Sequence, residues 1–361
     1  MINLEKSPVA TKDLGWREMV APYKHPNVLI SIWQIANTFI PFFVTLFLMF
    51  QSLNYSYWLT LALAPLAAGF QLRVFIILHD CGHQSFFKSQ KANDILGSIC
   101  GVISFTAYYH WRHFHALHHA TVGDLGRRVE GELLPMTIKK YALNNGDVLT
   151  LTLNEYQNLS GWEKLIYRFY RHPVLLFVVA PLLLFMVLHR FANSRASRRE
   201  RYSVYLTNLA ILAMLLALVF TIGLVPLLLV TLPMVILSST AGVWLFYIQH
   251  QFEDTYWEKG KQWNFVVAAL KGSSYYKLPL VLQWFTGNIG FHHIHHLNPR
   301  IPNYNLQKCH DANPLFQQTD AIGIKVGLRS IFLSLWDEEE KKMIGFSSKR
   351  LKALKSTEAS Q

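Results

Sequence analysis

Four long apolar runs alternate with polar segments along this chain, and the runs come in two pairs. They cover residues 28–50, 57–78, 204–224 and 226–248. Because a helix needs about 20 apolar residues to cross the hydrocarbon core of a bilayer, each run predicts a transmembrane helix. The turn within each pair is short and uncharged, so each pair predicts a helical hairpin. We therefore expect an all-α integral membrane protein with two transmembrane hairpins (four spans), short interfacial helices and a cytoplasmic helical cap.

Two shorter apolar stretches, 95–109 and 173–189, fit a complete span less well. The second has basic residues on both sides, with Arg168 and Arg171 before it and Arg190 after it. A complete span would put one of these basic groups outside the cell, so the pattern favours a segment that dips into the inner leaflet or lies along it. A topology with six full spans stays open at this point.

The positive charge of the chain is distributed unevenly. There are 34 Lys and Arg against 22 Asp and Glu, a net charge of +12, yet neither hairpin turn holds a Lys or an Arg. The positive-inside rule then places both termini and the central region in the cytoplasm, at the plasma membrane. Arg73 lies near the inner end of the second run, where we expect its guanidinium to reach the interface. The excess charge fits attraction to the anionic inner leaflet better than nucleic-acid binding.

One membrane unit accounts for most of the chain. Only 16% of the residues are charged, against about a quarter in soluble proteins. We expect a cytoplasmic N-terminal arm at 1–27, a membrane domain at 28–340 and a basic C-terminal tail at 341–361. The segment 337–355 is expected to form a solvated or lipid-facing surface.

Three histidine clusters follow the apolar runs. The first holds two histidines spaced i, i+4, the second and third both have the pattern HxxHH, and one more histidine ends the fourth run. On a helix, residues three and four positions apart share a face, so each cluster can aim its imidazoles at one site or at two adjacent sites. The candidate ligands are His79, His83, His115, His118, His119, His250, His292, His295 and His296.

These histidines predict a metal centre in the cytoplasmic cap. Neutral imidazole binds iron, copper, zinc and nickel alike, so the residues by themselves do not choose the metal. Nine nitrogens suit two ions with four or five ligands each, which leaves positions for oxygen species. Because all nine candidates fall on the predicted cytoplasmic side, they can meet at one face of the membrane.

Other polar residues are expected to support the ligands. A metal-bound imidazole commonly donates the N–H of its second ring nitrogen to a carboxylate or another polar group, which fixes its tautomer. The acidic candidates are Asp80, Glu253 and Asp254, each of which can equally be a surface charge. His110, His113 and His293 are the histidine candidates, whereas we take His25, His172, His189 and His310 as ordinary polar residues.

The three boxes HxxxH, HxxHH and HxxHH, set after two transmembrane hairpins, resemble those of the membrane fatty acid desaturases. The neighbouring sequence is also similar, in the segments 75–87, 244–254 and 286–304. The likeness runs from about residue 28 to about residue 340. It points to the bacterial acyl-lipid branch, which includes the Bacillus-type phospholipid desaturases and, less closely, the Δ12 enzymes.

The resemblance implies an O2-dependent enzyme that introduces a cis double bond into the acyl chain of a membrane phospholipid, at Δ5 or Δ12. It implies that the nine histidines hold two iron ions and are the catalytic residues, with His250 as the extra ligand before the third box. In animal members of known structure, an asparagine one turn before that histidine holds a water on one metal. Phe246 occupies this position here, and Asn288 is a candidate substitute.

The chain also lacks the HPGG motif of a fused haem domain, so the resemblance implies a separate electron carrier, a ferredoxin or a flavodoxin. An apolar tunnel must bring the acyl chain to the metals. Phe42, Phe43, Phe105 and Trp244 are candidates to line it, although aromatic residues in spans commonly serve packing or lipid contact.

Two alternative functions stay open. The same oxidising chemistry serves related hydroxylases, ketolases and epoxidases, and no residue of this chain separates these outcomes from first principles. A metal-transporting or metal-sensing membrane protein is an alternative of another class. A transporter would distribute its histidines along a path through the bilayer, whereas these histidines gather at one face.

Overall fold

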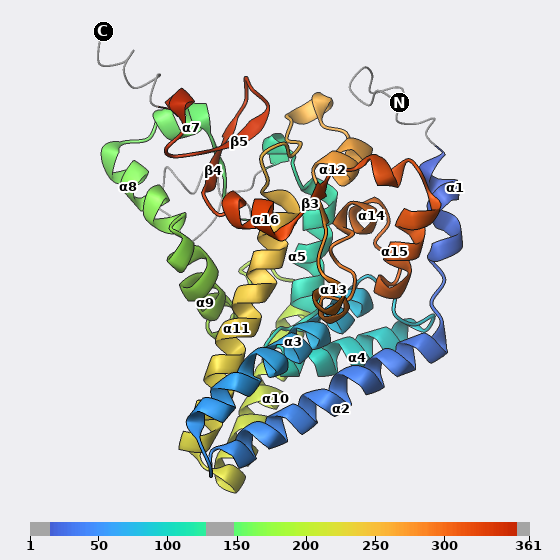
Figure 1. The fold of residues 1–361 in the computed structure, drawn as a ribbon, viewed down its shortest axis with the longest axis vertical. Helices are drawn as coiled ribbons and strands as arrows, with labels where there is room; N and C mark the ends of the chain where they lie inside the picture. Colours follow the sequence, from blue (N-terminus) through green and yellow to red (C-terminus); the bar gives the residue numbers. More distant parts are fainter. Residues whose placement is uncertain (1–14, 128–147, 352–361) are drawn as a thin grey trace.

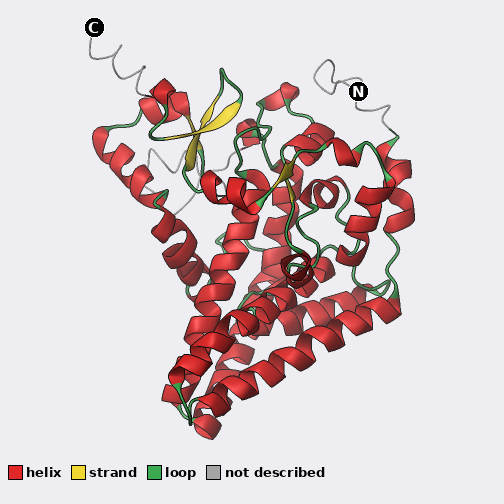
Figure 2. Cartoon of the chain, viewed as in Figure 1, coloured by secondary structure: helices red, strands yellow, loops and turns green. Residues whose placement is uncertain are grey.

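A computed structural model of the chain describes residues 15–127 and 148–351, and helices dominate it (Figures 1 and 2). Four helices are long and apolar enough to cross a membrane: α2 (Val28–Ser52), α3 (Tyr57–Gly82), α10 (Arg198–Ile222) and α11 (Leu224–His250). They form two hairpins, α2–α3 and α10–α11. The prediction of a mainly helical membrane protein with four membrane-compatible helices is confirmed.

Side-chain hydrogen bonds cap the N-termini of both helices of the first hairpin. The Asn27 carboxamide oxygen accepts hydrogen bonds from the backbone N–H groups at the start of α2, and the Ser56 hydroxyl caps α3 in the same way. Along α2 the buried residues recur every three or four positions from Ser31 to Ser52, and the opposite face exposes apolar side chains. α3 is the most buried of the four long helices, because α2, α11 and α4 (Gln90–Ile103) all pack against it.

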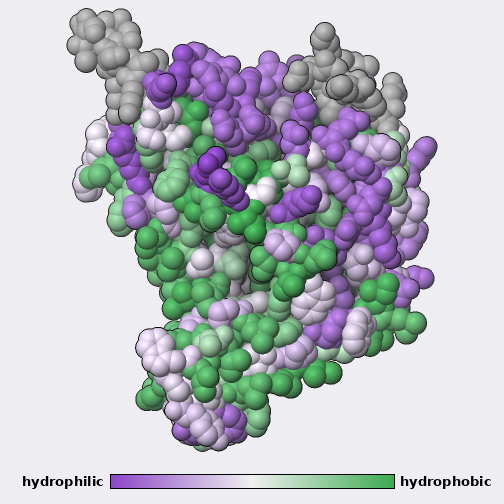
Figure 3. Space-filling model, in the orientation of Figure 1, coloured by the Kyte–Doolittle hydropathy of each residue, from purple (hydrophilic) through white to green (hydrophobic). Residues whose placement is uncertain are grey.

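The surface divides into an apolar part and a polar part. Figure 3 shows hydrophobic residues around the lower part, where the four long helices converge, and hydrophilic residues around the upper part. On α10, large apolar side chains such as Leu206, Leu209 and Phe220 are exposed. Contact with lipid hydrocarbon accounts for this exposure, since water would penalise it.

The upper part is a helical cap, residues 251–351, that covers the end of the bundle where α3 and α11 finish (Figure 1). The helix α5 (Tyr108–Thr121) rises into it, and α1 (Trp16–Val20) packs beside it. Its own helices are α12 (Phe265–Lys271), α13 (Leu280–Phe285), α14 (His292–Leu297), α15 (Asn303–Ala312) and α16 (Ile324–Ser330). A core that includes Phe291, Ile294 and Leu306 joins α12, α14 and α15.

Five short strands stabilise the cap, and the sequence patterns did not predict them. β1 (Leu151–Thr152), β4 (Leu333–Asp337) and β5 (Lys342–Gly345) form one sheet, in which β1 and β4 are parallel and β4 and β5 antiparallel. β2 (Tyr275–Tyr276) pairs in parallel with β3 (Ala321–Ile322). β5 lies within the segment 337–355, so the expected surface segment is wrong there: Met343 and Ile344 are buried. The charged residues just before Met343 and Ile344 kept this short apolar pair from standing out in the hydropathy pattern.

The two shorter apolar stretches do not form straight spans. The first forms the 14-residue α4, which at about 1.5 Å per residue is shorter than the hydrocarbon core. The second forms a π-helix, η3 (Leu175–Val179), and α9 (Ala180–Met186), followed by η4 (Leu188–Arg190). With α8 (Gly161–Tyr170) it makes a pair bent by 56°, either a broken span or a re-entrant segment. Six full spans are not found within 15–127 and 148–351. The remaining elements are α7 (Leu153–Gln157), η1 (Ala21–Tyr23), η2 (Leu125–Arg127), η5 (Gly260–Gln262) and η6 (Phe316–Gln318).

The guanidinium of Arg73 does not reach the interface, which corrects the sequence-based expectation. Arg73 is only 4% exposed. Its Nε donates to the hydroxyl of Thr38 at 3.1 Å, and an Nη donates to the backbone carbonyl of Trp284. The guanidinium also lies 3.9 Å from the centre of the Trp284 ring. The charge therefore joins α2, α3 and α13 inside the protein, where polar partners offset its desolvation.

Candidate metal centre

Four helices bring the nine candidate ligands together at the junction of the spans and the cap. His79 lies in the last turn of α3 and His83 caps its C-terminus, while His250 is the last residue of α11. The remaining six come from α5 and α14. Since α3 and α11 both end beneath the cap, the site forms at one end of the membrane helices rather than along them (Figure 1).

A close backbone contact sets the position of α14. The carbonyl of Gly290 accepts a hydrogen bond from the N–H of Tyr276 at 2.7 Å, just before α14 begins. A side chain at position 290 would collide with the carbonyl oxygen of Tyr276, so this approach of β2 requires glycine. The contact fixes the start of α14 and with it the direction of the third histidine cluster.

The nine histidines form two groups of possible ligand atoms, and within each group these atoms all lie within 4.8 Å of one another. The first group contains five residues, His79, His83, His115, His119 and His295. The second contains four, His118, His250, His292 and His296. The two groups are adjacent, because the rings of His119 and His296 stack with their centres 4.1 Å apart.

Each HxxHH cluster divides its imidazoles between the two groups. α5 sends two histidines to the five-histidine group and one to the four-histidine group, and α14 does the reverse. Adjacent residues on a helix point about 100° apart, so His118 and His119 face different groups. The sequence left open one site or two adjacent sites, and the structure arranges the possible ligand atoms in two groups.

The nitrogen separations fit metal coordination. Nε2 of His292 lies 3.0 Å from Nε2 of His250, and Nε2 of His118 lies 3.2 Å from Nε2 of His296. In the other group, Nε2 of His119 lies 3.0 Å from that of His295. Two nitrogens bound at right angles to one ion, each at about 2.1 Å, are about 3.0 Å apart. Neither group includes a carboxylate or a thiolate from the described part of the chain, so the donor sets are imidazole only.

Burial keeps these imidazoles neutral and able to bind a metal. Desolvation, with the neighbouring imidazoles as the next cause, holds the pKa well below the usual histidine value at His83, His115, His119, His292, His295 and His296. The neutral ring offers a lone pair, whereas the protonated ring does not. In addition, Nε2 of His83 is buried with no hydrogen-bond partner among the described residues. A metal ion would satisfy it.

Hydrogen bonds to second ring nitrogens orient two of the ligands. Nδ1 of His250 lies 3.1 Å from the backbone carbonyl of Gly272, which fixes the tautomer with Nδ1–H and leaves Nε2 to face the group. Nδ1 of His79 lies 3.4 Å from an oxygen of Asp80. The other Asp80 oxygen accepts two hydrogen bonds from Asn303, both at 2.8 Å.

Sequence reasoning missed Asn303 and Gln34, which complete this arrangement. The carboxamides of Gln34 and Asn303 exchange hydrogen bonds of 2.7 and 3.1 Å, so α2 and α15 both support Asp80. Both residues are buried. The polar Gln34 within an apolar run was the only available signal, and it does not identify its partner 269 residues away.

Several other expectations are corrected by burial and hydrogen bonding. Glu253 and Asp254 are exposed, so of the three acidic candidates only Asp80 lies at the site. His113 is also exposed and faces Glu200. By contrast, His310 forms a hydrogen bond of 3.2 Å with His293, which agrees with its interpretation as an ordinary polar residue.

The position occupied by asparagine in the animal enzymes is filled by an aromatic ring. The centre of the Phe246 ring lies 4.9 Å from that of His118. Asn288 does not replace the missing amide, because its carboxamide bonds Gln283 and the carbonyl of Asn303. Of the tunnel candidates, Phe42 is buried, Phe105 and Trp244 are half-buried, and Phe43 is exposed toward lipid.

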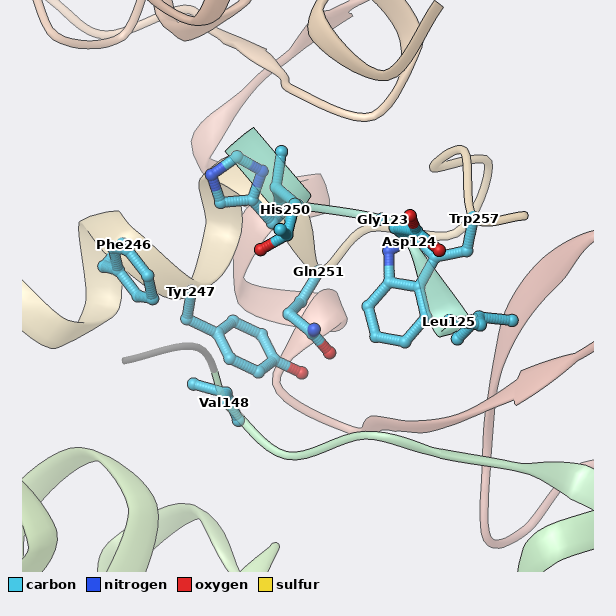
Figure 4. Close-up of a pocket in the computed structure, with 11 residues that line it drawn as sticks. Gly123, Asp124, Leu125, Val148, Phe246, Tyr247, His250, Gln251 and Trp257 are labelled. Carbon is cyan, nitrogen blue, oxygen red and sulfur yellow. The ribbon is translucent and has the colours of Figure 1, made fainter. Parts of the chain in front are cut away.

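A small hollow of about 20 Å³ lies beside His250 (Figure 4). Phe246, Tyr247 and Gln251 border it from the end of α11, and the loop 121–125 closes the opposite side. A volume of roughly 15 Å³ is enough to hold one water molecule. The four-histidine group therefore has room for a water at its edge, next to Phe246.

Comparisons with known proteins show which family this chain belongs to. The family model described as fatty acid desaturase matches residues 56–321. A fatty acid desaturase of Bacillus subtilis (strain 168) is 44% identical over 343 residues, which cover 95% of this chain and 93% of that protein.

Two cyanobacterial proteins are more distant relatives. The sn-1 oleoyl-lipid 12-desaturase of Synechocystis sp. is 24% identical, over 66% of this chain and 63% of that protein. The sn-1 acyl-lipid omega-3 desaturase (ferredoxin) of Nostoc sp. (strain 36) is 26% identical, again over 66% of this chain and 63% of its own length. These two matches span less than two thirds of the relatives' lengths.

Proposed function

Because this chain belongs to the fatty acid desaturase family and is therefore an oxidoreductase, we propose that it introduces a cis double bond into the acyl chains of membrane phospholipids, using O2 and a histidine-held diiron centre. The observation that carries the proposal is the convergence of nine imidazoles, seven of them buried and two half-buried, into two adjacent groups where α3 and α11 end. A metal-transport function is disfavoured, because these residues cluster at one end of the spans.

Two iron ions are the cofactor we propose. The five-histidine and four-histidine groups supply one set of nitrogen donors each, and the separations of about 3.0 Å between facing nitrogens suit an ion bound to both. When bound, iron would supply, together with O2, the oxidising power to take two hydrogens from an unactivated methylene pair, which no side chain can supply.

The residues of the chain bind, orient and shield. The nine histidines are the proposed ligands and the proposed catalytic residues. Gly272 and Asp80 hold the tautomers of His250 and His79, so that each ring presents its other nitrogen to its group. Phe246 covers the side of His118 and limits the access of water. Such shielding prevents side reactions of a strong oxidant.

Electrons must come from outside the chain in this proposal. The acyl chain loses two hydrogens, a donor supplies two electrons and the solvent supplies two protons, so that O2 is reduced to two molecules of water. We propose a ferredoxin or a flavodoxin as the donor. The printed name of the Nostoc relative includes ferredoxin, which supports this class.

We propose Δ5 or Δ12 as the position of the new bond. The name of the Synechocystis relative specifies position 12 on an oleoyl lipid and supports the second of these. The Bacillus relative, although far more similar, is named without a position. Both names are compatible with an acyl group that is already part of a lipid.

We further propose that the protein lies in the plasma membrane with its termini and cap in the cytoplasm. The absence of Lys and Arg from both hairpin turns supports this orientation. The proposed organisation is an arm at 1–27, a membrane domain at 28–340 and a tail at 341–361, of which residues 1–14 and 352–361 lie outside the described structure.

The direct test is expression of the full chain in a host that lacks desaturases, followed by mass spectrometry of the lipids with localisation of double bonds. We expect one new cis double bond at a single position. A His118→Ala variant with the same membrane abundance should give none. Hydroxylated or keto lipids in place of unsaturated lipids would refute desaturation, and so would product formation by the variant.

A further inference from the structure

A second, open cavity of about 230 Å³ lies where η4 meets the first turn of α10. Two arginines line it: Arg190 from the end of η4 and Arg201 from the start of α10. Asn193 and Tyr205 also contribute to its wall. The proposed metal centre uses none of these residues.

No carboxylate of the described residues neutralises the positive charge of this cavity. Arg190 donates to the Asn208 carboxamide at 2.8 Å and to the carbonyl of Phe105, and no ion pair joins it to an acid of the described chain. Nε of Arg190 is also buried without a partner among the described residues. A guanidinium carries five N–H donors, so one N–H on each Nη of Arg190 stays without a partner in the described part of the chain, beside this buried Nε–H.

Arg201 is held in a similar way. It donates to the carbonyls of Ala196 at 3.0 Å and Ser194 at 2.7 Å, both neutral groups, and again uses two of its five donors. The nearest acidic residue along the chain, Glu200, accepts from the Ser197 hydroxyl at 2.7 Å and faces His113. Two guanidiniums with neutral partners at one cavity are suited to a phosphate, which accepts paired N–H donors.

The surroundings favour a lipid over a soluble anion or an acidic protein. The cavity opens where a membrane-compatible helix begins, Phe191 in its wall is exposed, and Leu206 and Leu209 are exposed further along the same helix. Phosphates of a bilayer lie at this depth, with their acyl chains beside such apolar side chains. A docking site for a soluble protein would not need this apolar surround.

A hydrogen bond links the cavity to α5. The N–H of Asn193 donates to Nε2 of His110 at 3.3 Å, and His110 lies at the start of the helix that carries three proposed ligands. A row of aromatic side chains also leads from η4 to the five-histidine group: His189, Phe185, Phe75, Trp111 and His115. Consecutive ring centres in this row are between 4.5 and 6.3 Å apart. The row offers an apolar wall for a chain that starts at the cavity.

We propose that Arg190 and Arg201 bind the phosphate of the phospholipid substrate and so fix the carboxyl end of its acyl chain relative to the metals. This assignment rests on the proposed acyl-lipid desaturation. It makes both arginines substrate-binding residues, and it identifies the headgroup chemistry as a phosphodiester rather than a neutral headgroup.

The binding test uses the full chain in nanodiscs of a neutral carrier lipid and measures bound lipid by native mass spectrometry. The probes are dipalmitoylphosphatidylglycerol, dipalmitoylglycerol, which has the same chains but no phosphate, and inorganic phosphate. Arg201→Gln should weaken phosphatidylglycerol binding at least about tenfold, because it removes hydrogen bonds to a charged group. Arg201→Lys should retain part of the binding.

Arg195→Gln is the matched control, because Arg195 is exposed in the same loop and is not part of the cavity wall. It removes the same charge and should leave binding unchanged. Arg190→Gln is an independent second variant if Arg201→Gln fails to fold. Diacylglycerol should bind all variants equally. Equal loss in Arg195→Gln and Arg201→Gln would overturn the site, since it would mean a diffuse charge effect.

The kinetic test compares the same two lipids as substrates. Arg201→Gln should raise KM for the phosphatidylglycerol about tenfold with little change in kcat, and should abolish the preference for the phosphate-bearing lipid. Lipid binding that depends on Arg201 without any effect on KM would overturn the substrate assignment. Binding of inorganic phosphate, or of an acidic carrier protein, in place of the lipid would overturn the lipid assignment. If the wild type converts neither lipid but binds phosphatidylglycerol through Arg201, the site is supported and the proposed reaction fails.

Discussion

Nε2 of His250 lies 3.0 Å from Nε2 of His292, so the last residue of a membrane-compatible helix meets the first residue of a cap helix. At this separation two imidazole nitrogens need a proton or a cation between them, because their lone pairs otherwise repel each other. A metal ion at this point would join α11 to α14. Its effect would therefore be structural as well as chemical.

Removal of the metal is expected to lower thermal stability. A ligand present at about 1,000 times its dissociation constant contributes about 4 kcal/mol to the folded state, so chelation should lower the unfolding midpoint by more than about 5 °C. Differential scanning fluorimetry before and after treatment with an iron chelator measures this shift. His250→Ala should remove the part of the response that comes from the ion at the four-histidine group, so the shift should be clearly smaller. A response of equal size in that variant would argue against a metal shared by α11 and α14.

Loss of one ligand should empty one group before the other. His296→Ala leaves three imidazoles in the four-histidine group but all five in its neighbour. We therefore expect metal analysis of the purified protein to find about two irons per chain in the wild type and about one in the variant. His113→Ala is the control, because His113 is exposed and belongs to neither group. Stoichiometric zinc without iron in the wild type would contradict the redox chemistry.

Asp80 should tune metal affinity through His79. Its carboxylate is buried, lies 3.4 Å from Nδ1 of His79 and is held by two hydrogen bonds from Asn303. Asp80→Asn keeps the shape and removes the charge, so iron affinity should fall about 10- to 100-fold in a chelator competition assay. Glu253→Gln makes the same chemical change at an exposed position and should have no effect. Unchanged affinity in Asp80→Asn would reduce Asp80 to a packing role.

Asp80 and Glu253 are both acidic residues close to a candidate histidine in the sequence, but only Asp80 is buried at the site, and the sequence does not distinguish them. Hydropathy predicted the four long helices because burial in lipid depends on the local composition. It placed the end of the second span at residue 78, whereas α3 continues to Gly82, because a helix that enters a protein cap no longer needs apolar side chains. The polar residues at that end are the functional ones.

Contacts between distant residues explain the remaining differences. The i, i+3 and i, i+4 spacing predicted which histidines share a helix face, but the division into five and four ligands depends on how α5 and α14 are oriented relative to each other. The burial of Arg73 depends in the same way on Thr38 and Trp284. No local pattern encodes such pairs, and the two-residue strands β2 and β3 are equally invisible to periodicity.

The native thiols should be inert in the folded protein. Cys81, Cys100 and Cys309 are free and buried. Burial raises the pKa of Cys309 to about 12, so at pH 8 roughly one thiol in ten thousand is ionised there. We expect negligible alkylation by iodoacetamide at pH 8 in mild detergent and modification of all three thiols after denaturation, measured by intact-protein mass spectrometry. Raising the pH toward 12 should increase the reactivity of Cys309. Rapid stoichiometric labelling at pH 8 would contradict its burial.

Inert native thiols allow the orientation to be tested with single added cysteines. Asn54 is exposed in the turn between α2 and α3, and Ser347 is exposed in the cap after β5. The positive-inside rule predicts that a membrane-impermeant maleimide labels Asn54→Cys on intact cells, whereas Ser347→Cys reacts only after permeabilisation. The reverse result would place the histidine groups outside the cell. A cytoplasmic ferredoxin or flavodoxin could not then reach them, so the same measurement also tests the proposed electron donor.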